Sequence, residues 1–384
     1  MTTEVKKELK TIRSDHTGAL RRPEWLRELG YSFSEGKATE AELREGQDKA
    51  IREVIAKQEE IGFPVVSDGE FRRTQFQESF GGAISGFAST PNAYRRPEAQ
   101  PARQEPGRVE SGPSGPGPAI VHRLPAQERL RLVRNVILEE YRFGASVAHV
   151  PVKVTLVGAD RVSQRFEWEN SRAVYADMDA FMADVVAIER QMIAEVVDAG
   201  CRYIQFDEPG YTAYVDPPLL ERMRARGEDP IAGLERSIAA DNAIMAGFDG
   251  VTFGLHICRG GGGGRGGNAW HREGSYDPIA ERLFTGLNCD RFLLEYDGDH
   301  AGTFEALRFM PADKVAVLGL VSNHGEVETA EYLRRRLDEA SRYISLDQVA
   351  ICPRCGLGGS ATEDVQWGKL RVIQQVANEI WGGE

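Results

Sequence analysis

The sequence predicts an α/β fold of the TIM-barrel class, because short apolar runs alternate eight times with longer helical segments along its 384 residues. The apolar runs are nearly continuous, as is typical of parallel strands that are buried on both faces. Polar residues follow directly after most of these runs, where barrel enzymes carry their chemistry. We therefore expect residues 1–384 to form a single barrel domain.

Eight strands are predicted, and a helical segment follows each of them except the sixth. In chain order the strands are Thr11–Arg13, Phe63–Ser67, Val152–Val157, Tyr203–Phe206, Val251–Leu255, Phe292–Leu294, Val315–Leu320 and Val349–Ile351. Helical segments are expected at Ala41–Gly62, Pro125–Phe143, Met178–Ala199, Ile231–Ala246, Pro278–Thr285, Thr329–Ser341 and Thr362–Trp381. The first strand is the shortest and has the weakest apolar pattern.

Two segments of biased composition interrupt this pattern. Residues 88–118, before the third strand, are rich in Pro, Gly, Arg and Ser and cannot build a core. We predict that they form a flexible insertion within the barrel domain, on its surface or disordered. Gly260–Gly267 lacks the Lys-Ser/Thr that ends a phosphate-binding loop. We expect it to be a flexible loop beside the site.

The bulk composition narrows the class of protein. The net charge is −12 and no long run of Lys or Arg offsets it, which argues against nucleic-acid binding. No apolar stretch is long enough to span a membrane, and the polar N-terminus is not a signal peptide. These features predict a cytoplasmic protein that acts on small molecules. Five cysteines in a chain this long do not indicate a disulfide framework, and we expect Cys201 and Cys289 to be buried small hydrophobes.

A zinc site is predicted at the carboxyl ends of three strands. His256 and Cys258 follow the fifth strand, Glu295 follows the sixth and Cys355 follows the eighth. Because parallel strands end at one rim, these side chains can converge on one ion, and this set of ligands suits Zn²⁺. Cys352 is a competing ligand, but it lies inside its strand, and no second Cys-x-x-Cys exists to complete a Cys₄ site.

The donor set indicates which chemistry the metal would support. Two cysteinates and a carboxylate give a zinc site about one net negative charge, which makes it a poor Lewis acid for generating hydroxide. The same site is well suited to holding a substrate thiol as the thiolate, whose sulfur can attack an alkyl carbon. Glu295 is the ligand that we expect to yield, since its hard oxygen is displaced by sulfur more readily than a cysteine is. No His-Glu-x-x-His motif of a zinc hydrolase is present.

These motifs resemble the cobalamin-independent methionine synthase family. The matching residues are His256-Ile-Cys258, Glu295, Cys355-Gly-Leu, Gln205-Phe-Asp-Glu-Pro209, Asp68-Gly-Glu70 and Leu318-Gly-Leu-Val-Ser322. The resemblance runs from Thr11 to the C-terminus and covers the catalytic barrel, so the chain looks like the single-barrel form. It implies zinc-dependent transfer of a methyl group to homocysteine, as in 5-methyltetrahydropteroyltriglutamate–homocysteine S-methyltransferase.

The same resemblance implies how the substrate is held. The residues that match the family's ammonium-binding positions are Glu70 and Asp207, and Ser14 matches the position near the homocysteine carboxylate. Carboxylates at the mouth of the barrel also suit a cationic amine on chemical grounds. Without the additional N-terminal barrel of the long enzymes, the methyl donor stays open between methyl-folate, methylcobalamin on a corrinoid protein and another small methyl donor.

Departures from the family pattern leave two alternative functions open. Arg13 replaces a glycine of the family's Ile-Gly-Ser, and Arg259 follows His-x-Cys; with Arg72, these side chains could bind a carboxylate, sulfonate or phosphate. The first alternative is therefore an enzyme like epoxyalkane:coenzyme M transferase, which adds a sulfonated thiol to an epoxide. The second is not an enzyme but a barrel in which zinc is structural or acts in sensing.

Overall fold

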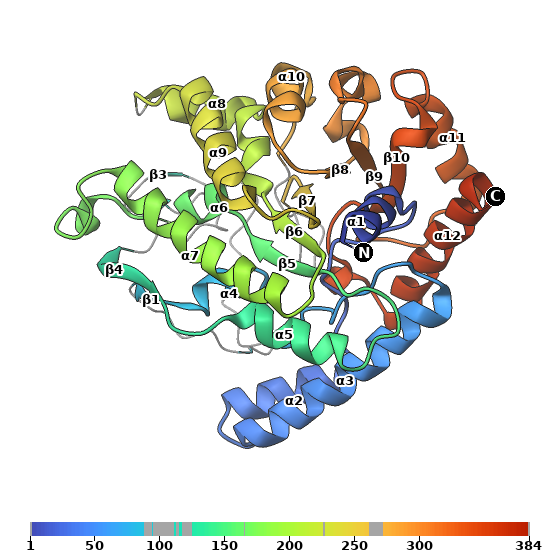
Figure 1. Ribbon diagram of the computed structural model, residues 1–384, viewed down its shortest axis with the longest axis horizontal. Coiled ribbons are helices and arrows are strands. Elements are labelled where there is room, and N and C mark those ends of the chain that lie inside the picture. The colour runs from blue at the N-terminus through green and yellow to red at the C-terminus, as the bar shows by residue number, and fades with distance from the viewer. Residues whose placement is uncertain are drawn as a thin grey trace.

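The computed structural model describes residues 2–87, 94, 111–112, 115–116, 125–164, 166–225, 227–260 and 272–382. Six parallel strands form one sheet in the order β10-β9-β8-β7-β6-β5 (Figure 1). They are β5 (Val154–Val157), β6 (Tyr203–Asp207), β7 (Thr252–Ile257), β8 (Arg291–Glu295), β9 (Val315–Val321) and β10 (Val349–Pro353). Every residue of these strands is buried, as expected for a sheet covered on both faces.

The first two predicted strands occupy the remaining positions of the barrel as short segments. Ser14 forms a parallel bridge with Ile351 of β10, and Val66 forms one with Val152, just before β5. The chain segments that follow these two bridges also hydrogen-bond to each other. These contacts join the two edges of the six-stranded sheet, and the predicted TIM barrel is confirmed.

Helices surround the strands (Figure 1), and the side chains at their ends explain where they begin. The helices of the described segments are α1 (Thr2–Thr11), α2 (Glu24–Ser34), α3 (Glu40–Ile61), α4 (Glu78–Gly81), α5 (Val136–Ala145), α6 (Ala159–Gln164), α7 (Met178–Asp198), α8 (Pro217–Ala225), α9 (Pro230–Met245), α10 (Asp277–Gly286), α11 (Ala330–Ala340) and α12 (Glu363–Trp381). At α3, Thr39 and Glu42 form a capping box, and Gly62 ends the helix with φ 95°. At α7 and α12 the side chains of Asp177 and Thr362 each accept a hydrogen bond from a backbone N–H of the first turn.

One predicted helix begins later than expected. Pro125–Phe143 was predicted to be helical, but Ala126–Leu132 is a strand, β4, which pairs antiparallel with β1 (Ile84–Phe87). In this stretch Arg and Leu alternate from Arg129 to Leu132, which is the period of a strand and not of a helix. The helix α5 begins only after Asn135, whose side chain accepts a hydrogen bond from the N–H of Leu138.

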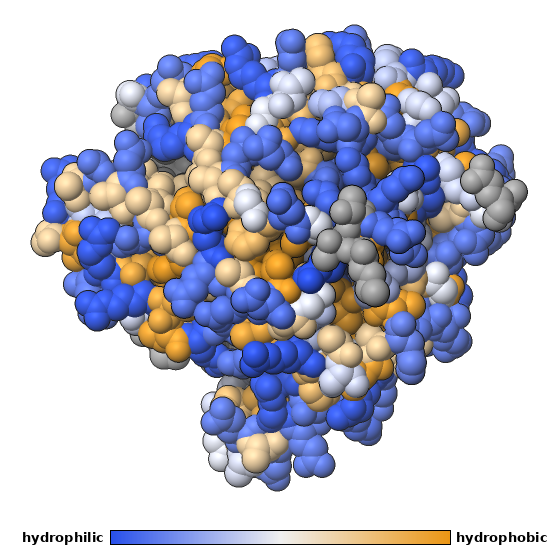
Figure 2. Space-filling model, in the orientation of Figure 1, coloured by the Kyte–Doolittle hydropathy of each residue, from blue (hydrophilic) through white to orange (hydrophobic). Residues whose placement is uncertain are grey.

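The predicted insertion at 88–118 lies outside the described residues, apart from Tyr94 and the two short strands β2 (Ser111–Gly112) and β3 (Gly115–Pro116). Of the loop Gly260–Gly267, only Gly260 is described. Figure 2 shows hydrophilic side chains over most of one face of the molecule, with apolar ones between them. Within the described ranges, no helix combines the length and the apolar character that crossing a bilayer requires.

A buried polar layer fills the barrel below the rim where strands end. Asp15 lies at its centre, with Lys153 at 2.6 Å, Arg291 at 3.3 Å and the Tyr203 hydroxyl at 2.6 Å. Burial opposes the ionisation of Asp15, but the two cations lower its pKa to about 2. The negative charge of Asp15 is thus balanced by Lys153 and Arg291 within the core, and its carboxylate is not available to a substrate at the mouth.

Candidate metal and substrate site

Three of the four predicted metal ligands lie together at the rim. The ligand atoms of His256, Cys258 and Cys355 are all within 4.8 Å of one another. His256 belongs to β7, Cys258 follows β7 directly, and Cys355 lies just beyond the end of β10. Cys355 is half-buried whereas the other two are buried, so this group lies where the core meets the mouth of the barrel.

The ring of His256 is oriented by Asp207 on the neighbouring strand β6. Nδ1 of His256 lies 2.9 Å from Oδ1 of Asp207, which also accepts a hydrogen bond from Nε2 of Gln205 at 2.9 Å. With Nδ1 as the donor, Nε2 is the nitrogen that can bind a metal. Burial lowers the pKa of His256, but the Asp207 contact and the charge of Cys258 outweigh it and raise the pKa to about 9.

The two cysteines of the group share one proton. A hydrogen bond from Cys355, opposed by burial and helped by the charge of His256, lowers the pKa of Cys258 to about 6. The same hydrogen bond and burial raise the pKa of Cys355 well above its ordinary value. Two cysteine sulfurs and a histidine nitrogen within this span fit a zinc ion, which binds sulfur and nitrogen at about 2.0–2.3 Å.

Cys352, the competing ligand, lies elsewhere. Its side chain is buried inside the barrel in a small apolar cluster with Leu293, Val315, Val317 and Ala350. Burial raises the pKa of its thiol, which disfavours the thiolate that a metal needs. The geometry therefore favours Cys355 over Cys352.

Glu295 is beside this group but is held by other partners. Its Oε1 accepts hydrogen bonds from Nε2 of His300 at 2.7 Å and from Nη1 of Arg354 at 3.2 Å, and its Oε2 accepts one from the backbone N–H of Arg259 at 2.8 Å. Its carboxylate forms a second group with Asp297 and His300, whose ligand atoms are also within 4.8 Å of one another. His256, Cys258, Cys355 and Glu295 are called the metal side below.

Two residues that contact the metal side through Glu295 were not predicted from the sequence. His300 lies five residues after Glu295, and Arg354 lies directly before Cys355. Burial opposes the ionisation of Glu295, but His300 and Arg354 hold the pKa of this carboxyl below its ordinary value. The closeness of His300 and Arg354 in sequence to predicted ligands was a signal that could have identified both.

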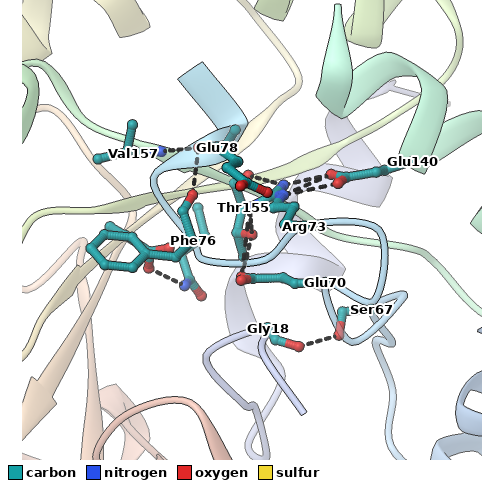
Figure 3. Close-up of polar contacts among 12 residues, drawn as sticks. Gly18, Ser67, Glu70, Arg73, Phe76, Glu78, Glu140, Thr155 and Val157 are labelled. Carbon is teal, nitrogen blue, oxygen red and sulfur yellow. Dashed lines mark hydrogen bonds and ion pairs between the residues drawn. The ribbon is translucent and has the colours of Figure 1, made fainter. Parts of the chain in front are cut away.

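Opposite the metal side, Asp68, Glu70 and Asp207 form a second group, called the carboxylate side. Glu70 has a φ of 59°, an uncommon value for a residue with a side chain, and its N–H donates to Oδ1 of Asp68 at 2.9 Å. Its Oε1 accepts a hydrogen bond from the Thr155 hydroxyl at 2.7 Å (Figure 3). Oδ2 of Asp68 is buried and has no hydrogen-bond partner within the described ranges.

A buried arginine supports this group from below. Nη2 and Nε of Arg73 contact the Glu140 carboxylate at 2.5 and 2.9 Å, and Nη2 also donates to the Thr155 carbonyl at 2.7 Å (Figure 3). Burial raises the pKa of Glu70; the charge of Arg73 opposes this and that of Asp207 adds to it. Glu70 and Asp207 are therefore close enough to repel each other, and a cation between them would relieve that repulsion.

Ser14, predicted to lie near the substrate's carboxylate, is not part of the carboxylate side. Its hydroxyl donates to Oε1 of Gln374 on α12 at 2.6 Å, and its backbone is fixed by the bridge to β10. The same chain segment reaches the carboxylate side four residues later, at Gly18, where an added Cβ would lie 3.1 Å from Oε1 of Glu70. The hydroxyl of Thr17, next to it, is buried and has no partner among the residues described.

The three arginines that supported an anionic substrate also lie elsewhere. Arg13 donates to the carbonyls of residues 347 and 349, where β10 begins. Arg72 binds Asp48 at 2.5 Å. Arg259 is buried over the Tyr276 ring, 4.4 Å from its centroid. Within the described ranges, none of the three donates a hydrogen bond to a residue of the carboxylate side, and the three do not form a common anion site.

Known proteins resemble this chain in sequence and in fold. Residues 22–112 match the family model for the catalytic domain of cobalamin-independent synthase. The chain is 31% identical to the uncharacterized protein YxjH of Bacillus subtilis, over 96% of this chain and 95% of that protein. It is 25% identical to the methionine synthase of Saccharolobus solfataricus, over 88% and 86% of the two chains.

A solved structure agrees with these matches. A crystal structure from Listeria monocytogenes, assigned as a vitamin-B12-independent methionine synthase, superposes with a TM-score of 0.73 at 27% identity and covers 96% of this chain and 98% of its own. The motifs at the rim, the fold and the full-length relatives agree with one another. The chain belongs to the cobalamin-independent methionine synthase family.

Proposed function

We propose that this protein is a zinc-dependent methyltransferase that converts homocysteine to methionine. Family membership supports a methyltransferase, and one observation about the site carries the finer proposal. Asp207 contacts the candidate ligand His256 through Oδ1 at 2.9 Å and lies within electrostatic reach of Glu70. A thiol at the metal side and an ammonium at the carboxylate side would therefore belong to one small molecule.

His256, Cys258, Cys355 and Glu295 would hold the metal. Bound zinc supplies a positive charge that lowers the pKa of a coordinated thiol and keeps its sulfur nucleophilic. Asp207 fixes the ring of His256, and the other ligands are set by the ends of β7, β8 and β10. The sulfur would attack the methyl carbon of the donor, the bond between that carbon and the rest of the donor would break with its electron pair staying on the donor, and the product would be the thioether methionine.

The carboxylate side would bind the ammonium of homocysteine. Glu70 and Asp207 repel each other, and Oδ2 of Asp68 is buried without a partner in the described part of the chain. An ammonium has three donors, which match these oxygens in number and in charge. Arg73 stays with Glu140 and holds Glu70 in place without filling this position.

This arrangement favours homocysteine over a sulfonated thiol. A sulfonate needs cations or several donors near the thiol position, but Arg13 and Arg72 donate to partners away from the carboxylate side and Arg259 is buried over the Tyr276 ring. The carboxylates that do face the site would repel a sulfonate. The methyl donor, methyl-folate or methylcobalamin, is identified by assaying each with the zinc-loaded protein and homocysteine.

The deciding experiment compares homocysteine with mercaptoethanesulfonate, which lacks the amine. In Glu70→Gln and Asp207→Asn we expect homocysteine affinity to fall about 10- to 100-fold, because each removes a charge-assisted contact. Metal content should stay near that of the wild type in Glu70→Gln, which is not a ligand. Glu139→Gln, an exposed carboxylate on α5, is the matched control and should change nothing.

Two outcomes would overturn the proposal. If the wild type binds mercaptoethanesulfonate more tightly and Glu70→Gln has no effect on it, the acceptor is an anionic thiol and small epoxides become the co-substrates to test. If no thiol binds and removal of the metal with a chelator unfolds the protein, the metal is structural and the protein is not a thiol methyltransferase.

A further inference from the structure

Gln205 lies between the charged core of the barrel and the carboxylate side. It is on β6, two residues before Asp207, so the two side chains lie on the same face of the strand. Gln205 is completely buried. Its partner in register on β5 is Thr155, whose hydroxyl contacts Glu70. Gln205 is therefore placed to act on the substrate site from below.

Both polar atoms of the Gln205 amide have partners. Oε1 accepts a hydrogen bond from Nζ of Lys153 at 2.9 Å. Nε2 donates to the Thr17 carbonyl at 3.0 Å and to Oδ1 of Asp207 at 2.9 Å. An amide nitrogen has two hydrogens, and both are used here. The side chain thus joins β6 to two other segments of the chain.

Lys153 determines which end of this amide faces Asp207. The lysine ammonium can only donate, so the amide oxygen has to face it. In the reversed orientation Nε2 would meet the ammonium, and Oε1 would meet two other acceptors, the Thr17 carbonyl and Oδ1 of Asp207. Lys153 is itself fixed, because it is buried and donates to Oδ1 of Asp15 at 2.6 Å. The charged core thus sets the orientation of Gln205.

Two donors meet on one oxygen of Asp207. Oδ1 accepts from Nε2 of Gln205 and lies 2.9 Å from Nδ1 of His256. The other oxygen, Oδ2, accepts no hydrogen bond from the residues that the structure describes. With one donor alone, the carboxylate could rotate about its terminal torsion, which has only broad minima. Two donors on the same oxygen fix the plane of the carboxylate and leave Oδ2 for another partner.

We propose that Gln205, held in one orientation by Lys153, is a positioning residue that aims Oδ2 of Asp207 at the ammonium of the substrate. This inference rests on the proposed function. Gln205 acts on the substrate only through Asp207, because both of its amide hydrogens are already used. Its effect therefore depends on the amine: Gln205 strengthens the binding of homocysteine and does not change the binding of a thiol that lacks the amine.

The test compares homocysteine with 4-mercaptobutanoate, which is homocysteine without its amine. Both thiols are titrated into the zinc-loaded wild type, Gln205→Met, Asp207→Asn and the double variant. In Gln205→Met, which keeps the size of the side chain, we expect homocysteine affinity to fall about 10-fold and 4-mercaptobutanoate affinity to stay unchanged. In the Asp207→Asn background, the same change should leave the ratio of the two affinities unchanged. Gln191→Met, at an exposed glutamine of α7, is the matched control.

Three results would overturn the role of Gln205. If the wild type prefers homocysteine but Gln205→Met weakens both thiols equally, or neither, the inference alone is wrong. If the wild type binds the two thiols equally, the ammonium site of the proposed function fails, and the inference with it. If Gln205→Met does not fold, a crystal structure of the wild type with homocysteine decides. Oδ2 of Asp207 should then contact the ammonium, and an ammonium on Oδ1 or away from Asp207 would overturn the inference.

Discussion

The two sides of the barrel mouth each contain a buried arginine against carboxylates, but the two arginines are held differently. On the carboxylate side, Arg73 contacts Glu140 through two nitrogens at 2.5 and 2.9 Å. On the metal side, Arg354 contacts Glu295 and Asp297 through a single nitrogen, at 3.2 Å in each case. A bidentate pair fixes both partners in one geometry, whereas a shared nitrogen leaves each carboxylate room to move.

This difference matches what each side is proposed to do. The carboxylate side has to present two negative charges at fixed positions, and Arg73 with Glu140 supplies a rigid support under Glu70. The metal side has to exchange partners: Cys258 and Cys355 share a proton, and Glu295 is shared between its neighbours. Preorganisation on one side and exchange on the other are both needed when a bound molecule must react.

The largest expected effect comes from removing the rigid arginine. Arg73→Met leaves Glu140 buried without its partner and should lower the free energy of unfolding by about 3–5 kcal/mol. Arg354→Met is the matched change on the metal side. Glu295 keeps His300 and the Arg259 N–H there, so we expect a loss of only about 1–2 kcal/mol. Urea unfolding of both variants measures the two values, and equal losses would contradict the comparison.

Removing a metal ligand should weaken zinc binding at the metal side and leave the carboxylate side unchanged. Cys258→Ser and Cys355→Ser should each lower zinc affinity by about 100- to 1000-fold, because each removes one of the few donors that share the binding free energy. Cys352→Ser is the control, since its side chain belongs to an apolar cluster inside the barrel. The zinc content that each of the three variants keeps in competition with a chelator measures this difference. Loss of zinc from Cys352→Ser with retention in Cys355→Ser would reverse the assignment.

The sequence predicted those features that depend on local pattern. Continuous apolar runs identified the six strands of the sheet. Because His256, Cys258 and Cys355 each lie at or just after the end of such a run, the sequence also predicted that the three are close together, as they are in the structure. The order of parallel strands around the barrel does not affect this result, because all of them end at the same rim.

The features that were missed depend on contacts between distant parts of the chain. The backbone of Ser14 is fixed by its bridge to β10, more than 300 residues away, and the weak apolar pattern near it gave no sign of this pairing. The hydrogen bonds to Glu295 likewise require Arg354 from the end of β10 and His300 from the loop after β8. Such tertiary partners cannot be derived from the period of a pattern.

The smallest expected effect concerns protons on the metal side. With the pKa of His256 at about 9, that of Cys258 at about 6 and that of Cys355 well above its ordinary value, the group at pH 7.5 carries protons on His256 and Cys355 but not on Cys258. A metal needs all three deprotonated, so binding should release about two protons at pH 7.5 and about three below pH 6. Zinc affinity should therefore fall as the pH falls, and more steeply below pH 6.

Asp207 links this proton count to the carboxylate side. Its contact with Nδ1 is the main favourable cause of the raised pKa of His256. In Asp207→Asn the pKa of His256 should fall toward its ordinary value, because burial then acts with less opposition. At pH 7.5 the imidazole would be mostly neutral, and zinc binding should release about one proton instead of about two. Calorimetric titration of zinc in two buffers of different ionisation enthalpy counts these protons. An unchanged count in Asp207→Asn would mean that Asp207 does not set the charge of His256, and that the two sides of the mouth titrate independently.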